Sequence, residues 1–169
     1  KINSAVFPNM QGGPMVHAIA AKAVAFGEAA RPEFRAYAAA VVANAQALAA
    51  ALVNGRLRIV SSGTDTHLML VDVSTRDITG QEAEDALRAA GIIANKNAIP
   101  FDPLPPRVTS GVRLGTPALT SRGMYAEDMD TVAGFILEAL DAAGKDGAAA
   151  SIRRHVLDFA SKFPVPGIN

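Results

Sequence analysis

Apolar residues recur every three or four positions in several stretches of the chain, which is the spacing of an α-helix with one buried face. In the longest stretch, Val41, Leu48 and Leu52 fall on one side, and Asn54-Gly55 follows as a usual helix stop. Thr79-Gly80-Gln81-Glu82 matches a capping box, which marks the start of another helix. The pattern predicts helices over about residues 14–29, 32–53, 80–90, 125–142 and 148–162.

Strands are predicted where the apolar spacing changes. Leu57 and Ile59 alternate with Arg56 and Arg58, as in a half-buried strand. Residues 67–73 are almost continuously apolar and predict a buried strand, and short strands are expected at 92–94 and 111–114. These elements alternate along the chain, so the expected fold is α/β, with helices covering a small sheet.

Composition narrows the range of functions. Half of the residues are hydrophobic and the formal net charge is zero, with no Lys/Arg cluster, which argues against nucleic acid or a membrane as a partner. The chain has no cysteine, so disulfides, thiolate nucleophiles and zinc–thiolate sites are excluded, and its three histidines are too far apart in sequence to predict a metal site. Asn44 and Gln46 interrupt the most apolar helix, which favours a soluble helix over a membrane span. A cytoplasmic location is expected.

The beginning of the chain resembles the interior of a longer polypeptide. Lys1 to Val6 contains neither an initiator methionine nor a signal-peptide pattern. Arg31-Pro32 interrupts the helical pattern, because the residue before a proline is disfavoured in a helix. We therefore expect a boundary here, with residues 1–30 needing a larger neighbour and residues 31–169 forming a compact domain.

Three stretches could carry chemistry. Gly12-Gly13-Pro14 places two residues without side chains before a helix, which suits the binding of a phosphate by backbone amides but also fits an ordinary tight turn. The proline-rich stretch from Asn95 to Pro106 joins two strands and could offer backbone groups and the Asn97 amide to a flat ligand. The alternative for this stretch is a proline-rich docking peptide.

Arg113 is the third candidate. Strand alternation places Val112 and Leu114 on one face and Arg113 on the other. A strand-held guanidinium suits bidentate binding of a carboxylate or phosphate, although a solvent-facing arginine on an edge strand has the same pattern.

Taken together, these stretches resemble the serine hydroxymethyltransferase family of pyridoxal-phosphate enzymes. The resemblance rests on "NSAVFPNMQGGPMVH", "GTDTHLMLVDV", "TGQEAEDAL", "NKNAIP" and "VTSGVRLGTPA", in this order, and it covers the whole chain. It implies the C-terminal portion of a fold-type-I enzyme: residues 1–30 would end the large cofactor-binding domain, and residues 31–169 would form the small α/β domain.

The resemblance assigns roles to the candidate residues. Gly12 and Gly13 match the glycine pair that contacts the cofactor phosphate of the other subunit in a homodimer. Arg113 matches the arginine that binds the carboxylate of serine or glycine. Asn97 and the Leu104-Pro105-Pro106 segment match the region that contacts the folate.

The implied reaction transfers the hydroxymethyl carbon of serine to tetrahydrofolate, giving glycine and 5,10-methylenetetrahydrofolate, with pyridoxal 5'-phosphate as cofactor. The family's Schiff-base lysine would lie upstream of Lys1, and Lys96 would only neighbour the folate pocket. No catalytic residue is therefore assigned within this chain, and the chain alone is not expected to be active. Whether the complete enzyme is a dimer or a tetramer stays open.

Two other interpretations remain at this stage. Another fold-type-I pyridoxal-phosphate enzyme, such as an aminotransferase or a threonine aldolase, would share the arginine site but is not expected to keep the folate-like segment. A non-catalytic dimerisation domain would bind no ligand through Arg113 or Asn97.

Overall fold

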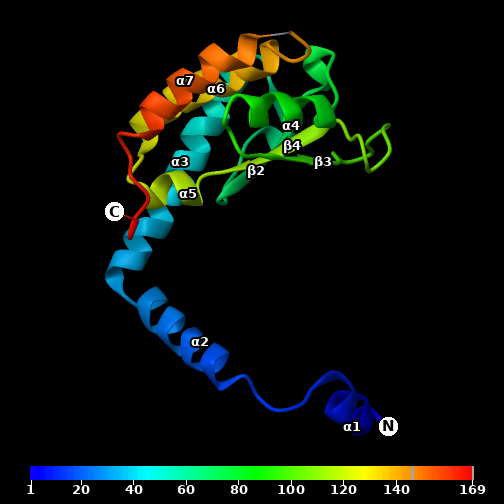
Figure 1. Ribbon diagram of the computed structural model, residues 1–169, viewed down its shortest axis with the longest axis vertical. Helices are drawn as coiled ribbons and strands as arrows, with labels where there is room; N and C mark the ends of the chain where they lie inside the picture. Colours follow the sequence, from blue (N-terminus) through cyan, green and yellow to red (C-terminus); the bar gives the residue numbers. More distant parts are fainter. Residues whose placement is uncertain (146, 169) are drawn as a thin grey trace. The chain divides into compact units, whose positions relative to one another are not determined.

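The computed structural model describes residues 1–145 and 147–168, and the chain divides into two units, Lys1–Ala36 and Tyr37–Asn169. Helix α3 (Pro32–Asn54) begins in the first unit and continues into the second. Figure 1 shows the elements of each unit in chain order.

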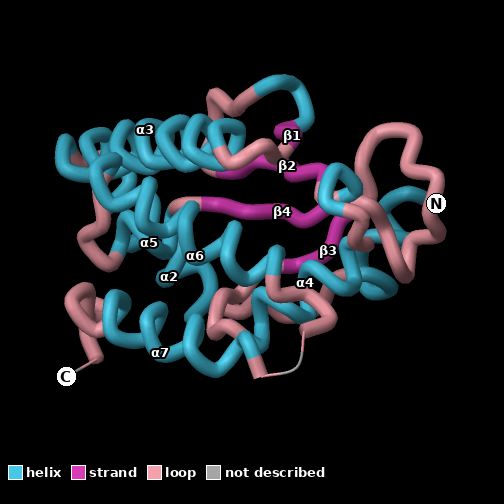
Figure 2. Tube along the Cα trace, turned by 90° about the horizontal axis from the view of Figure 1, so that it is seen from above, coloured by secondary structure: helices cyan, strands magenta, loops and turns pink. Residues whose placement is uncertain are grey.

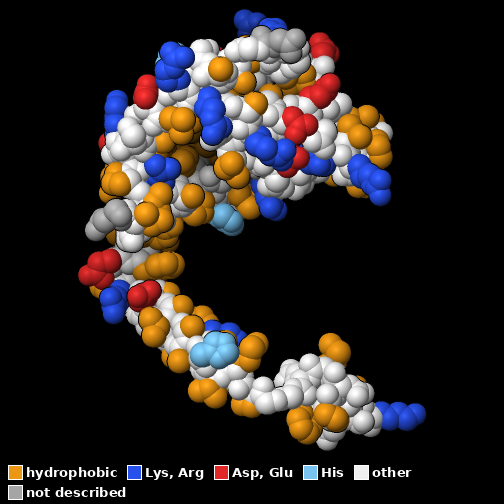
Figure 3. All heavy atoms as spheres, viewed as in Figure 1, with side chains coloured by type: hydrophobic (Ala, Val, Ile, Leu, Met, Phe, Trp, Pro, Cys, Tyr) orange, Lys and Arg blue, Asp and Glu red, His pale blue; other side chains and the backbone are white. Residues whose placement is uncertain are grey.

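The first unit consists of short helical turns and one regular helix. Helix α1 (Ile2–Ser4) and the turn η1 (Ala5–Met10) precede an extended segment, and helix α2 (Val16–Ala29) follows. The helix begins two residues later than the predicted start at Pro14. Among the described residues none buries a side chain of α2, and large hydrophobic residues such as Met10 and Phe26 are 83% and 71% exposed. Figure 3 shows hydrophobic side chains along this unit.

Helix α3 buries one face in the second unit, as its apolar spacing predicts. Its buried residues include Leu48 and Leu52, which belong to the hydrophobic core. In the described part of the chain, α3 is the one helix long and apolar enough to cross a membrane by length and composition, and 39% of its most apolar window is buried inside the protein. A helix in the core of a protein can be equally long and apolar, so these two properties do not by themselves indicate a membrane span.

A four-stranded antiparallel sheet lies at the centre of the second unit, in the order β1-β2-β4-β3 (Figure 2). Its strands are β1 (Arg58–Ile59), β2 (Leu68–Asp72), β3 (Asn95–Asn97) and β4 (Gly111–Gly115). Strand β4 therefore has a neighbour on each side, which holds its backbone in place.

The two faces of the sheet differ in what covers them. Met69, Val71, Val112 and Leu114 share a face, and their side chains join the core formed by α3, helix α4 (Gly80–Ala89) and helix α6 (Met129–Asp141). Residues paired across an antiparallel ladder point to the same side. The other face therefore carries Arg113 together with its paired neighbours, and it is the less covered one.

Helix α4 begins as predicted. The Thr79 hydroxyl accepts a hydrogen bond from the Glu82 amide, and the Glu82 carboxylate accepts one from the Thr79 amide at 2.8 Å. The hydrogen bonds that the Thr79 amide and the Thr79 hydroxyl donate to the Glu82 carboxylate lower the pKa of this carboxyl. The helix ends before Gly91, whose φ of +84° suits glycine.

The remaining helices pack at the C-terminal end. Short helix α5 (Pro117–Ser121) follows β4, the 3₁₀ turn η4 (Ala126–Asp128) leads into α6, and α7 (Ala148–Ala160) closes the core through Ile152. The buried Asn44 amide connects α3 to this region, because it donates to Thr120 Oγ1 at 2.8 Å and to the Met124 carbonyl at 2.9 Å. Two more 3₁₀ turns, η2 (Val60–Ser62) and η3 (Ser74–Arg76), flank β2.

One strand prediction is wrong. Residues 92–94 do not form a strand; the third strand of the chain is β3, three residues later. The Ile92 amide donates to the Leu87 carbonyl and so closes the end of α4, while Ile93 is 89% exposed. Asn95–Asn97 pairs with Gly111–Arg113. The position of this edge strand is therefore determined by backbone pairing with β4 and not by a run of apolar residues.

Candidate functional site

Arg113 lies in the middle of β4, on the less covered face of the sheet. Its Cα is paired with Asn95 of β3 and with Leu70 of β2, while Val112 and Leu114 on either side are buried. This is the alternation that the sequence predicts. The strand fixes the Arg113 backbone on both sides and leaves the side chain exposed.

The Arg113 guanidinium has no hydrogen bond or ion pair to the residues that the structure describes. By contrast, Arg58 on the same sheet donates through Nε and Nη2 to Asp72, both at 2.8 Å. A planar guanidinium without an internal partner can offer two parallel donors to an external carboxylate or phosphate. The geometry at Arg113 therefore suits an anionic ligand.

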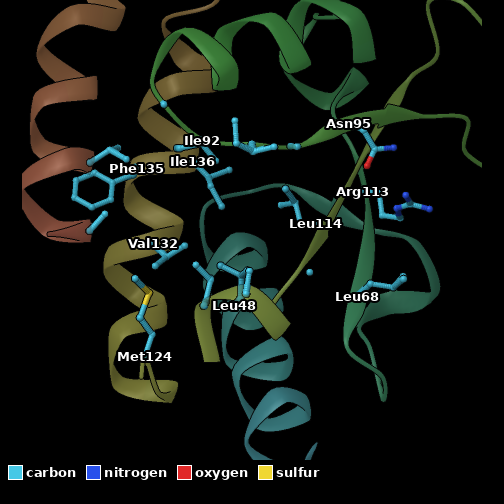
Figure 4. A pocket seen from close by; sticks show the side chains of 18 of the residues that line it. Leu48, Leu68, Ile92, Asn95, Arg113, Leu114, Met124, Val132, Phe135 and Ile136 are labelled. Atoms are coloured by element: carbon cyan, nitrogen blue, oxygen red, sulfur yellow. The ribbon is translucent and has the colours of Figure 1, made fainter. Parts of the chain in front are cut away.

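A pocket of about 710 Å³ adjoins this residue. Strand β4 continues past the end of β3 at Leu114 and Gly115, and the pocket opens beside this part of β4. Figure 4 shows Arg113 and Asn95 at one end together with Leu68, and most of the apolar side chains at the other; Leu114 points toward the apolar end and Arg113 extends away from it. The apolar end includes Leu48, Met124, Val132, Phe135 and Ile136.

Asn97 lies at the end of β3, paired with Gly111 and two residues along the ladder from the Asn95–Arg113 pair. Its side chain is partly exposed, and its Nδ2 donates to the Ala98 carbonyl at 2.8 Å. Asn97 and Arg113 are therefore on the same face of the sheet. The proline-rich connection begins after Asn97 and not at Asn95 as the sequence suggested, because residues 95–97 are themselves a strand.

One carboxylate organises this connection, residues 98–110. Asp102 Oδ2 accepts hydrogen bonds from the amides of Ile99 at 3.0 Å and Ser110 at 2.8 Å. Its Oδ1 accepts from the Leu104 amide at 2.9 Å and the Ser110 hydroxyl at 2.7 Å. Desolvation raises the pKa of Asp102, but the four hydrogen bonds outweigh it and lower the pKa to about 2. Asp102 is therefore ionised at neutral pH.

The end of the same connection rests on helix α4. The Gly80 amide donates to the Thr109 carbonyl at 2.8 Å and the Gln81 amide donates to the Val108 carbonyl at 3.0 Å. These bonds satisfy the first amides of the helix. Together with the Asp102 bonds, they hold both ends of the connection in place. Within it, Leu104 is partly buried, while Pro105 and Pro106 are exposed.

Lys96 faces the opposite side of the sheet from Arg113. Its Nζ lies 3.3 Å from Glu84 Oε2 of α4, in a partly buried ion pair. Its place in the ladder, between Asn95 and Asn97, accounts for this orientation. The structure thus gives Lys96 a partner in the fold.

Gly12 and Gly13 lie in the first unit, in the extended segment before α2. Both are exposed, neither has a positive φ, and a Cβ built on either would meet nothing within 4 Å among the described residues. No side chain of the described chain caps the start of α2 at Met15. This open helix start, preceded by residues without side chains, is accessible to an anion.

Arg113 and Asn97 share one face of the sheet, and the Leu104–Pro106 segment lies in the connection between β3 and β4. Among the described residues, neither Asn97 nor this segment lines the pocket beside Arg113, and Gly12 and Gly13 belong to the first unit. Sequence reasoning included Asp102 in the proline-rich stretch but gave it no role. A signal was present, because aspartate before proline and a nearby serine are typical of a turn held by side-chain hydrogen bonds.

The family model described as serine hydroxymethyltransferase matches residues 1–136, which is more than half of the chain. The chain belongs to the serine hydroxymethyltransferase family. A serine hydroxymethyltransferase of Acidiphilium cryptum is 56% identical over 98% of this chain and 40% of its own length. The corresponding protein of Myxococcus xanthus is 56% identical over 97% of this chain and 39% of its own length.

A third relative, serine hydroxymethyltransferase 2 of Rhodospirillum rubrum, is 52% identical over 99% of this chain and 40% of its own length. The chain therefore spans about two fifths of the length of the curated relatives it matches. Family membership confirms the resemblance predicted from the five sequence stretches. It places an α/β chain with a small antiparallel sheet within the serine hydroxymethyltransferase family.

Proposed function

We propose that this chain is the C-terminal portion of a serine hydroxymethyltransferase. The complete protein transfers the hydroxymethyl carbon of serine to tetrahydrofolate and forms glycine and 5,10-methylenetetrahydrofolate. The observation that carries the proposal is the 56% identity to a serine hydroxymethyltransferase over 98% of this chain. The Arg113 guanidinium, which has no partner among the described residues, supports it, because the substrate is a carboxylate.

Arg113 binds the carboxylate of serine and glycine in this proposal. Its backbone is fixed by strands on both sides and its side chain is exposed. Binding the substrate therefore breaks no ion pair between the guanidinium and another described residue. A bidentate contact orients the amino acid as well as holding it.

Asn97, Leu104, Pro105 and Pro106 contact the folate. Asn97 offers both a donor and an acceptor on the Arg113 face, and the two exposed prolines present a rigid apolar surface. A flat heterocycle with polar edges needs this combination. The fixed shape of the connection around Asp102 supports the assignment.

Pyridoxal 5'-phosphate is the cofactor, and when bound it supplies the electron sink for chemistry at the substrate α-carbon. Gly12 and Gly13 fit a contact with its phosphate, because a Cβ at either position meets nothing within 4 Å among the described residues and none of their side chains caps the start of α2. In the proposal they reach the phosphate of the partner subunit in a homodimer, which can assemble further into a tetramer.

In this proposal the chain contributes to two parts of the enzyme, with a boundary six residues before the one between the two structural units. We assign residues 1–30 to the end of the large cofactor-binding domain and residues 31–169 to the small α/β domain. The exposed hydrophobic residues of the first unit support this, since apolar side chains such as Ile2 and Phe26 need a neighbouring surface to cover them. The enzyme works in the cytoplasm.

The proposal is tested with the full-length protein that contains this chain. Purified with pyridoxal phosphate, it should form methylenetetrahydrofolate from serine and tetrahydrofolate, whereas the 169-residue chain alone should form none. Transamination without any requirement for tetrahydrofolate would instead identify an aminotransferase and overturn the proposal.

A further inference from the structure

Asp102 holds together the start, the middle and the end of the 98–110 connection. Its two oxygens accept from Ile99 near the start, from Leu104 in the middle and from Ser110 at the end. Ser110 is 2% exposed and directly precedes β4. One carboxylate therefore joins the rigid sheet to the exposed segment.

We propose that Asp102 is a positioning residue that holds Leu104, Pro105 and Pro106 where the folate needs them. This inference rests on the proposed function, because it takes the folate contacts of that segment as given. Asp102 itself touches no substrate in it. The residue acts through the Leu104 amide, which it binds at 2.9 Å.

Proline content explains why the connection needs such a residue. Pro100, Pro103, Pro105 and Pro106 have no backbone N–H, so they cannot donate the hydrogen bonds that usually fix a backbone. The amides of Ile99, Leu104 and Ser110 converge on Asp102 instead. A carboxylate can accept all of these bonds because it carries no donor at neutral pH.

The same geometry predicts what the isosteric amide does. In Asp102→Asn one oxygen becomes an NH₂ group, which cannot accept from a backbone N–H. An NH₂ in place of Oδ2 would face two amides, those of Ile99 and Ser110. In place of Oδ1 it faces only the Leu104 amide, because the Ser110 hydroxyl can turn and accept. Asp102→Asn therefore releases Leu104 and keeps the bonds to Ile99 and Ser110.

The test uses the full-length holoenzyme and compares three variants. Asp102→Asn removes the Leu104 bond, Ser110→Ala removes the hydroxyl bond to the same carboxylate, and Asp85→Asn is the matched control. Asp85 lies on the exposed side of α4, where it accepts from Gln81 at 2.8 Å and Arg88 at 3.0 Å. The measurements are KM for tetrahydrofolate, kcat for serine, and the dissociation constant of glycine without folate.

We expect Asp102→Asn to raise KM for tetrahydrofolate about tenfold, since the lost bond involves a charged acceptor. The glycine dissociation constant and kcat at saturating folate should stay near those of the parent, because Arg113 is held by the sheet. Ser110→Ala should shift KM in the same direction by less, and Asp85→Asn should leave it unchanged.

An unchanged KM for tetrahydrofolate in Asp102→Asn would overturn the inference. Equal losses of folate affinity, glycine affinity and kcat in Asp102→Asn would also overturn it, because they would show that Asp102 stabilises the whole domain and not the folate segment in particular. Both results require a parent enzyme that uses tetrahydrofolate. A parent that binds no tetrahydrofolate overturns the proposed function itself, and the two failures are thus distinguishable.

Discussion

The amide of Gly80 donates to the carbonyl of Thr109 at 2.8 Å, and the Thr109 side chain fills the space beside the Gly80 Cα. A Cβ on Gly80 would overlap Thr109 Oγ1 and lie 2.5 Å from the Gly111 carbonyl oxygen. The end of the 98–110 connection can rest on α4 only because this residue has no side chain. Gly80 thus links a helix start to the strand that carries Arg113.

Gly80→Ala should therefore destabilise the chain. We expect the free energy of unfolding to fall by about 1–3 kcal/mol, since the overlap forces backbone to move. Gly134→Ala is the matched control: Gly134 is exposed within α6, and a Cβ there meets nothing within 4 Å among the described residues. That change should raise the free energy of unfolding by about 0.5–1 kcal/mol, because alanine is the better helix former. Urea denaturation of both variants measures the difference, and equal effects would contradict the close packing at Gly80.

The Asp102 carboxylate should make stability depend on acid pH. Its pKa falls from the ordinary 3.8 to about 2 in the folded chain, so the folded state favours the ionised form. This contribution is fully present above about pH 4 and is lost as the pH falls through about 2. The difference in free energy of unfolding between the parent and Asp102→Asn should be constant from pH 5 to 7 and shrink below pH 4. Asp72, whose pKa is also lowered, titrates in both proteins and cancels. A difference that persists undiminished at pH 2 would contradict the hydrogen bonds of Asp102.

Gly13 offers a test of the phosphate contact. A Cβ at Gly13 meets nothing within 4 Å among the described residues, so Gly13→Val should weaken cofactor retention more than it weakens folding of the full-length protein. A cofactor phosphate that approaches the backbone would meet the new side chain, so pyridoxal phosphate should dissociate more readily from this variant. Gly27→Val is the control, since Gly27 is also exposed, and a Cβ there meets nothing within 4 Å among the described residues. Equal cofactor retention in both variants, with an intact dimer, would argue against the assignment.

Much of the second unit follows from local sequence patterns. The helical spacing of Val41, Leu48 and Leu52 predicts the buried face of α3, and the capping box at Thr79 predicts the start of α4. Alternation around Arg113 predicts which side chains of β4 are buried. Each of these patterns depends only on neighbours in the chain, so the sequence contains it directly.

The features that sequence patterns missed depend on contacts between residues that are not close neighbours in the sequence. Strand β3 is polar and exists because it pairs with β4, so no apolar pattern marks it. The role of Asp102 depends on Ser110 returning to it across the connection. Helix α5 is a partial exception, because Thr116-Pro117 is a usual helix start and could have predicted it.

Titration of glycine into the full-length enzyme tests most directly whether Arg113 binds the substrate carboxylate. Charge-assisted hydrogen bonds contribute about 1.5–3 kcal/mol each, so Arg113→Ala should weaken glycine binding by about 2–5 kcal/mol. Arg113→Lys should recover little, because an ammonium group cannot form the planar pair. Arg154→Ala, which removes an exposed arginine of α7, serves as the control.

Carboxylate binding by Arg113 predicts that Arg113→Ala retains pyridoxal phosphate, that glycine no longer perturbs the cofactor spectrum at concentrations that saturate the parent, and that serine turnover with tetrahydrofolate is lost. Glycine binding by Arg113→Ala with the parent's affinity would contradict it and leave Arg113 as an exposed strand residue without a ligand.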